Sequence, residues 1–204
     1  MTPHHALATT AVGTAIPAAL AQRLAVDVHA GPISATAVFS PDRTYRYLLT
    51  RDWGLAPRLV VLMLNPSVAD ADVDDPTIAR VIRFAMREGC GGLVVLNLFA
   101  LRATDPAELA RTADPVGPDN DAMLDVVTAD RAQPVVIAWG AIAYRPAHRS
   151  RTNTVTERLQ ARGVPLCCLG RTRGGHPRHP LYLPATAPLT PWQPLATQGK
   201  TEDH

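Results

Sequence analysis

Polar residues follow several apolar runs of this sequence, and their types suit the binding of a polar ligand. Asn65-Pro66-Ser67 comes directly after one apolar run, and Asn97 lies near the end of the next. A later loop carries His176 and His179, whose imidazole groups can exchange protons near neutral pH. The candidate site residues are Asn65, Pro66, Ser67, Asp72, Asn97, Phe99, Trp139, Arg171, Arg173, His176, Arg178, His179 and Tyr182.

Each of these motifs also has a purely structural interpretation. Asn65-Pro66 can simply begin a turn, and Asp75 can cap the helix that follows it. The aspartates at positions 70, 72 and 74 can form a solvated acidic loop. Asn97 is harder to dismiss, because a buried amide destabilises the fold unless its hydrogen bonds are satisfied. Asn97 therefore either links parts of the fold through hydrogen bonds or recognises a ligand.

The two histidines of the late loop have a spacing that would suit a metal ion. However, Pro177 and Pro180 interrupt it, and two of the three cysteines lie in a predicted strand. Structural zinc requires four ligands. We therefore expect neither a metal ion nor another cofactor.

Charge is distributed unevenly along a chain whose formal net charge is only +2. From Pro66 to Asp130 there are twelve acidic and five basic side chains. From Ala141 to Pro180 there are eight arginines and one acid, Glu157. A basic stretch on an otherwise acidic protein indicates an anionic partner. The alternative is that these arginines are scattered over a solvated surface.

Length and composition indicate one globular domain. The chain has 204 residues, of which 47% are hydrophobic and 5% aromatic, so the core must be mainly aliphatic. Three cysteines do not suggest a disulfide framework, and we interpret them as reduced thiols. No apolar run approaches the roughly 18 residues of a membrane helix. We expect a cytoplasmic protein with a flexible extension over residues 1–30, one domain over 31–192 and a flexible tail over 193–204.

Apolar runs predict the strands that would position these residues. Ser34–Ser40 and Tyr45–Trp53 alternate in polarity around a turn, which predicts a β-hairpin. Four continuous apolar runs are typical of strands that are buried on both faces. These runs are Arg58–Leu64, Gly92–Ala100, Pro134–Gly140 and Pro165–Gly170.

Helical patterns separate these runs. Pro76–Glu88 has apolar residues at helical spacing, with Asp75 as the expected cap, and Asp119–Asp130 and Thr152–Arg162 are also predicted helices. Alternating strands and helices predict a three-layer α/β/α sandwich with a mainly parallel sheet and the hairpin at one edge. Ligands of such sheets bind beyond the carboxyl ends of the strands, where the candidate residues lie.

The chain resembles an uncharacterised bacterial and phage family, catalogued as domain of unknown function 1643. The resemblance runs in order from about Ser34 to Trp192. It is carried by Tyr45–Leu48 with Arg51 and Trp53, Met63–Ala85, Val94–Pro106, Asp114–Asp121, Trp139-Gly140 and Gly175–Tyr182.

A weaker resemblance links the same residues to the uracil-DNA glycosylase superfamily. In that superfamily, a polar residue before a proline orients water, a later strand carries an Asn that reads the base, and a late His-Pro loop contacts the nucleotide. The parallels here are Asn65-Pro66, Asn97 and His179-Pro180, with Leu181 where the superfamily usually has serine.

Three hypotheses follow for the function. The first is an enzyme that cleaves a nucleobase N-glycosidic bond, most often in DNA. Asn65 or an aspartate of the 70–75 segment would place water and His179 would donate a proton. Asn97 would bind the base edge, and Phe99 or Trp139 would stack on the base. Phosphates would be held by Arg171, Arg173 and Arg178.

Two alternatives remain open. One is a nucleic-acid-binding module without catalysis, which uses the same basic loop. The other is an enzyme that acts on a free nucleotide or another phosphorylated metabolite, with Asp72 and Asp74 holding a divalent cation. The expected partner is thus a nucleic acid, in the first place DNA, or a nucleotide, and not a membrane.

Overall fold

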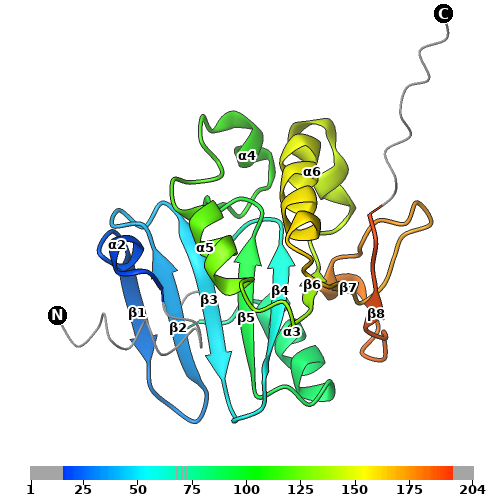
Figure 1. Ribbon diagram of the computed structural model, residues 1–204, viewed down its shortest axis with the longest axis horizontal. Coiled ribbons are helices and arrows are strands. Elements are labelled where there is room, and N and C mark those ends of the chain that lie inside the picture. Colours follow the sequence, from blue (N-terminus) through cyan, green and yellow to red (C-terminus); the bar gives the residue numbers. More distant parts are fainter. Residues whose placement is uncertain (1–15, 68, 70, 72, 195–204) are drawn as a thin grey trace, which may run out of the picture.

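One mixed β-sheet forms the centre of the protein. The computed structural model describes residues 16–67, 69, 71 and 73–194, and in this part of the chain the strands form a single eight-stranded sheet in the order β1-β2-β3-β5-β4-β6-β7-β8 (Figure 1). The strands are β1 (Ala25–His29), β2 (Ser34–Phe39), β3 (Arg46–Asp52), β4 (Arg58–Met63), β5 (Gly92–Asn97), β6 (Val135–Ile137), β7 (Leu166–Cys168) and β8 (Thr190–Pro191).

The four apolar runs form the four adjacent parallel strands β5, β4, β6 and β7. The prediction of a mainly parallel sheet is nevertheless wrong, because four of the seven neighbouring pairs are antiparallel. The predicted hairpin is present as β2 and β3, but β1 continues the sheet beyond it. On the other side, β8 adds an antiparallel edge. The mixed α/β class itself is confirmed.

Sequence signals for the two edge strands are weak. β1 lies in the segment assigned to a flexible extension, as does the short helix α2 (Ala18–Ala21) before it. β8 has only two residues, one of them a proline, which occurs in sheets mainly at edges. Residues 1–15 and 195–204, which the expected extension and tail include, lie outside the described residues.

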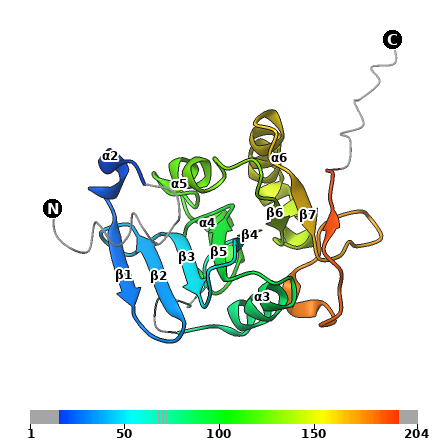
Figure 2. The same cartoon turned by 60° about the horizontal axis from the view of Figure 1, so that its bottom comes forward.

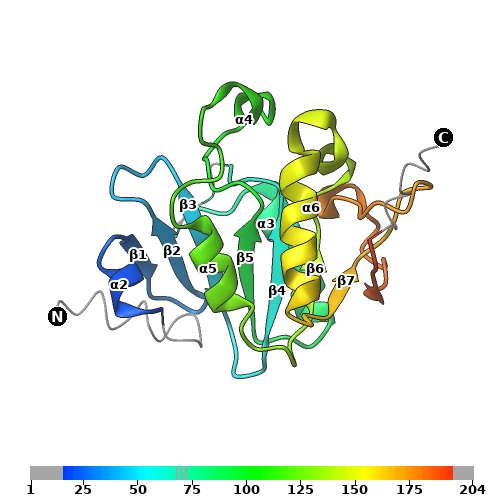
Figure 3. The same ribbon diagram turned by 45° about the horizontal axis from the view of Figure 1, so that its top comes forward.

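Helices cover both faces of the sheet. α3 (Pro76–Arg87) packs on one face, whereas α5 (Asn120–Val127) and α6 (Pro146–Ala161) lie on the other, as Figures 2 and 3 show from two sides. α3 begins as predicted, with the Asp75 carboxylate accepting hydrogen bonds from the N–H groups of Thr77 and Ile78 at 2.8 and 2.9 Å. A short helix, α4 (Ala107–Arg111), projects beyond the carboxyl ends of the central strands (Figure 1).

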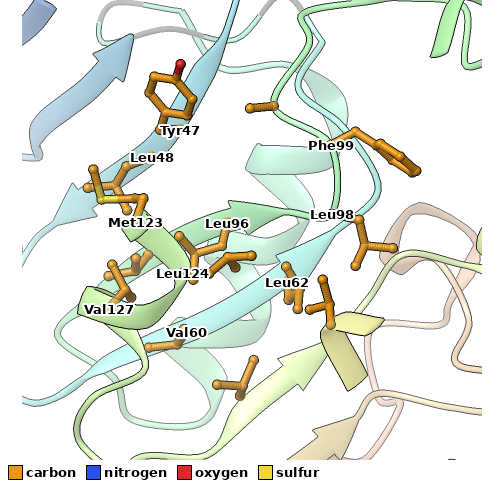
Figure 4. Close-up of a cluster of buried hydrophobic side chains, with 14 of the residues drawn as sticks. Tyr47, Leu48, Val60, Leu62, Leu96, Leu98, Phe99, Met123, Leu124 and Val127 are labelled. Carbon is orange, nitrogen blue, oxygen red and sulfur yellow. The ribbon is translucent and has the colours of Figure 1, made fainter. Parts of the chain in front are cut away.

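The strand alternation divides the core into two layers. In β4, Val60 and Leu62 face α5 and α6, whereas Leu59, Val61 and Met63 face α3. Figure 4 shows the first layer, where side chains of α5 pack onto those of β3, β4 and β5. Because both faces of β4 are buried, its sequence has no polar alternation.

α6 begins six residues earlier than the sequence pattern indicated. Pro146 occupies its first turn, a favoured position for proline. Its buried side chains include His148, Thr152 and Thr156, which do not form an apolar stripe. The hydroxyls of Thr152 and Thr156 are satisfied by the carbonyl oxygens of His148 and Thr152. Among the described residues, no helix has the length and apolar character needed to cross a membrane.

The end of β5 is held by a buried amide that sequence analysis did not select. Asn120, 0% exposed, donates from Nδ2 to the carbonyl oxygens of Asn97 and Leu98, both at 3.1 Å. Replacing Asn120 with Ala should leave two buried carbonyls without this donor. We expect the free energy of unfolding, measured in urea, to fall by about 1–3 kcal/mol. Asn153→Ala, at a half-exposed position, should change it by less than about 0.5 kcal/mol; equal effects would contradict this role.

Candidate functional site

The sheet has a topological switch at β4. From β4 the chain crosses through α3 to β5 on one side, and then through α5 to β6 on the other. Ligands of open α/β sheets bind where such crossovers diverge, beyond the carboxyl ends of the strands. A cleft of about 440 Å³ opens next to this point, beyond the end of β6. It is lined by Pro106, Trp139, Gly140, Ala141, Ile142, Thr172, Arg178, His179 and Tyr182.

The outer wall of the cleft is the loop after β7, which backbone hydrogen bonds shape into a tight turn. Thr172 N–H donates to the His176 carbonyl at 2.8 Å, and Gly175 N–H donates to the Thr172 carbonyl at 3.0 Å. Gly175 has a φ of 76°, which glycine adopts without strain. Arg173 lies at the exposed tip of this turn, so the turn holds its guanidinium out toward solvent.

His179 forms the corner between this loop and the short 3-10 helix η2 (Pro180–Tyr182). Its Nδ1 accepts a hydrogen bond from Leu181 N–H at 3.4 Å. Burial lowers the pKa of His179 below its usual value, and the nearby Asp75 carboxylate opposes this shift. A neutral ring whose Nδ1 is an acceptor carries its proton on Nε2. His179 is therefore suited to donate a hydrogen bond from the wall of the cleft.

Gly140 allows His179 to approach the end of β6. Its φ is 77°, and a Cβ placed at this position would lie only 3.2 Å from the Cβ of His179. Both the backbone conformation and the close contact therefore require glycine at this position.

The predicted stacking residues do not expose their rings. Trp139 is 0% exposed and packs edge-on against Tyr144 and Trp192, with centroid distances of 6.5 and 6.0 Å. Phe99 is buried against His148 and does not line the His179 cleft. The accessible ring at the cleft is Tyr182, which is 71% exposed and lies 5.7 Å from His179, centroid to centroid.

The side chains of Asn65 and Asn97 have different hydrogen-bond partners and surroundings. The amide of Asn65 donates to the carbonyl oxygens of Pro66 and Ala103, at 3.0 and 2.8 Å. Asn97 is 2% exposed, and its Nδ2 has no partner among the described residues. Since Val95 faces α3, strand alternation places Asn97 on that same face. Neither residue lines the His179 cleft.

The acidic segment before α3 lies only partly within the described residues. Asp70 and the candidate Asp72 fall outside them. Asp74 is engaged by Arg51, which is buried, with its Nη2 2.7 Å and its Nε 2.9 Å from Oδ1 of Asp74. Within residues 16–67, 69, 71 and 73–194, three or more His, Cys, Asp or Glu side chains do not gather as a metal site would require.

The eight arginines of the basic stretch separate into two groups. Arg151 pairs with Asp121 of α5 at 2.5 Å, and Arg158 and Arg162 pair with Asp125. Hydrogen bonding from Arg158 lowers the pKa of Asp125. The other five have no carboxylate partner among the described residues, and lie on the loops after β6 and β7 or at the start of α6: Arg145, Arg149, Arg171, Arg173 and Arg178.

A second cavity of about 650 Å³ adjoins the cleft at Ala141. Arg145 and Arg149 line it, together with Tyr144 and His176, whose rings stack with centroids 3.9 Å apart. Burial raises the pKa of Tyr144 to about 12, so its phenol stays neutral at physiological pH. The structure thus brings Trp139, His176, Arg178, His179 and Tyr182 of the predicted site together at two adjoining cavities, although the ring of Trp139 is buried.

A family model described as "Protein of unknown function (DUF1643)" matches residues 46–181. The chain belongs to the DUF1643 family. The matched range begins at the first residue of β3 and ends within η2, so it includes all four parallel strands and the His179 loop. It leaves out β1, β2 and β8. Neither the curated proteins nor the solved structures contain a match.

Several residues of the two cavities are absent from the residues that the sequence of this DUF1643 member predicts for the site. Arg145, Arg149 and Thr172 carry side chains that suit anions, and Gly140 shapes the wall of the cleft. The two arginines belong to the basic stretch, but nothing in their spacing separates them from the three that pair with α5. Gly140 ends one of the apolar runs, and its proximity to His179 depends on the tertiary fold.

We predict that replacing Gly140 with Ala disturbs His179 as well as the backbone. Gly140 has φ 77° and ψ 171°, a backbone region that is almost restricted to glycine, so a Cβ there costs about 1–3 kcal/mol of stability, and here it also crowds the histidine. Gly163→Ala is a matched control, because Gly163 has a φ of 71° and a Cβ there would meet nothing within 4 Å. Both variants should lose stability, but only Gly140→Ala should shift the imidazole NMR signals of His179. Unchanged signals in Gly140→Ala would contradict the close contact.

Proposed function

We propose that this DUF1643 protein binds nucleic acid across the face that surrounds the His179 cleft. The observation that carries the proposal is a group of five arginines that have no carboxylate partner among the described residues. Arg145, Arg149 and Arg178 line the two adjoining cavities, and Arg171 and Arg173 lie on the loop that forms the outer wall of the cleft. Unneutralised arginines attract phosphate, because the guanidinium group matches phosphate oxygens with paired hydrogen bonds. Arginines that were only solvated surface would not be expected to gather on these loops.

The side chains between the arginines favour a nucleic acid over a small inorganic anion. Tyr182 offers an exposed ring on which a base can stack. His179 and Thr172 offer hydrogen-bonding groups on the wall of the same cleft. Cavities of about 440 and 650 Å³ have the size that a nucleotide unit needs.

We predict that the double variant Arg173→Ala/Arg178→Ala weakens binding to a fluorescent single-stranded DNA oligonucleotide. Each phosphate contact that is lost should reduce the dependence of log affinity on log salt concentration by about 0.7. Fluorescence anisotropy at several salt concentrations measures both effects.

The control is Arg83→Ala/Arg131→Ala, which removes the same charge from exposed positions on α3 and in the loop before β6. Its salt dependence should match that of the parent protein. If both double variants lower affinity equally, only net charge matters and the proposed face is incorrect.

A second candidate function is hydrolysis of a nucleobase N-glycosidic bond on this bound nucleic acid. It is favoured by the neutral His179, whose Nε2–H could stabilise negative charge on a departing base. Water would add to the sugar carbon while the bond to the base nitrogen breaks, and the proton that the water loses would pass to the departing base. Because Asn65 does not line the cleft, this candidate function gives it no contact with the water. The resemblance to uracil-DNA glycosylases points to the same chemistry.

This second function predicts base release that depends on His179. An oligonucleotide that carries a single uracil should acquire an abasic site, detected as alkali-labile strand cleavage. His179→Ala should reduce the rate by about 10²-fold or more, as for the loss of a donor to a developing anion. DNA binding should change little. If the parent protein binds the uracil oligonucleotide tightly but does not cleave it, the protein binds DNA without this uracil-excision activity.

A further inference from the structure

A third cavity lies at the same end of the sheet as the His179 cleft, beyond the carboxyl ends of β4 and β5. Its volume is about 330 Å³, and it is separate from the His179 cleft. Three loops contribute to it: the turn between β2 and β3, the segment after β4 and the segment after β5. Its lining residues are Arg43, Thr44, Ser67, Leu101, Arg102, Ala103 and Thr104.

Arg102 is the cation of this cavity that lacks a counter-ion within the described part of the chain. Arg43 is bound by Asp27 through two hydrogen bonds of 2.6 and 2.7 Å. Arg102, in contrast, has no carboxylate partner among the described residues, and its Nη1 makes only a 3.4 Å contact with the Arg43 carbonyl. Its Nε is buried without a partner in that part of the chain. A partly buried guanidinium that lacks a counter-ion is stabilised when an anion binds beside it.

The position of Arg102 is fixed before any ligand binds. Its guanidinium carbon lies 5.3 Å from the centroid of the Phe39 ring. The backbone on either side is also held, since Arg102 N–H donates to the Thr44 carbonyl and Ala103 N–H donates to the Pro66 carbonyl, at 3.1 and 3.0 Å. The hydroxyl-bearing side chains of Ser67 and Thr104 line the same cavity. A guanidinium held near hydroxyl groups is a suitable arrangement for a phosphate.

One loop connects this cavity to the cleft. Residues 101–104 line the Arg102 cavity, and Pro106, two residues further on, lines the His179 cleft. Both cavities therefore lie along the same loop. This loop leads from β5 into α4, beyond the carboxyl ends of the parallel strands (Figure 1). A single extended polyanion could reach both, whereas a mononucleotide that fills one would leave the other empty.

We propose that the Arg102 cavity is a second phosphate subsite, and that the ligand is an oligonucleotide whose backbone crosses the 101–106 loop. The inference rests on the proposed nucleic-acid binding at the His179 cleft. It adds that Arg102, with Ser67 and Thr104, holds a backbone phosphate outside the cleft. It thus assigns the protein to polynucleotides rather than to free nucleotides.

The test compares ligands of different length on three proteins. Arg102→Gln removes the charge but keeps a side chain that can pack on Phe39. Arg111→Gln is its control, because Arg111 lies on neighbouring α4 and already pairs with Asp105 at 3.3 Å. The probes are a mononucleotide and fluorescent single-stranded DNA of 4, 8 and 16 nucleotides. We expect Arg102→Gln to weaken binding of the longer strands about tenfold and to lower their salt slope by about 0.7. Mononucleotide binding should not change.

The outcomes separate this inference from the proposed function. If Arg102→Gln binds the 16-nucleotide strand like the parent while Arg173→Ala/Arg178→Ala binds it weakly, the cleft binds nucleic acid and the second subsite is overturned. If Arg173→Ala/Arg178→Ala has no effect either, the proposed function fails with it. A thermal melt of each variant checks folding. Thr104→Val, which leaves Arg102 in place, repeats the test if Arg102→Gln melts early, and parent-like binding by a folded Thr104→Val would then overturn the subsite.

Discussion

The structure depends on the double burial of β4. This strand pairs on both edges, with β5 and β6, and packs on both faces, against α3 on one side and α6 with α5 on the other. Crossovers between parallel strands have a fixed hand. A chain that moves from β4 first to one side and then to the other must therefore place its helices on opposite faces. The loops at the carboxyl ends diverge for the same reason, and the cleft and its neighbouring cavities lie among these loops.

Ion pairing between α5 and α6 decides which part of the basic stretch can meet a ligand. The acidic side chains of α5 lie opposite the middle and the end of α6 and neutralise Arg151, Arg158 and Arg162. Within the described residues, no such acidic element pairs with the start of α6 or the loop after β7, and five arginines there lack a carboxylate partner. The uneven charge of the sequence thus becomes an uneven surface because the acidic helix pairs with its basic neighbour only from Arg151 onward.

The sequence allowed the parallel core to be predicted, because burial on both faces leaves a signal in the residues themselves. It did not reveal the antiparallel edges, since β1 is short and half-exposed and β8 contains a proline. Nor did it reveal the first turns of α6, whose buried positions carry His148 and Thr152 rather than aliphatic side chains. These elements are stabilised by their neighbours in the fold, so their own residues carry little local preference.

For the candidate site, closeness in the chain predicted which residues lie together better than position at a strand end did. His176, Arg178, His179 and Tyr182 lie within one loop, and short separation in the chain kept them together at the cleft. Asn97 and Phe99 lie at or just beyond the end of β5, where one residue of register decides between the interior and the cleft wall. A single sequence indicates that such residues are near a strand end, but not which face they occupy.

Asn65 illustrates how a predicted site residue can act through its neighbours. Its Nδ2 binds the Ala103 carbonyl, and the N–H of Ala103 binds the carbonyl of Pro66. These two bonds tie the segment after β4 to the start of the loop after β5. That loop lines the Arg102 cavity with residues 101–104 and the His179 cleft with Pro106. The asparagine therefore fixes the loop that lies along both cavities. A nucleic acid that bridged them would depend on Asn65 for the spacing of its contacts, even without touching it.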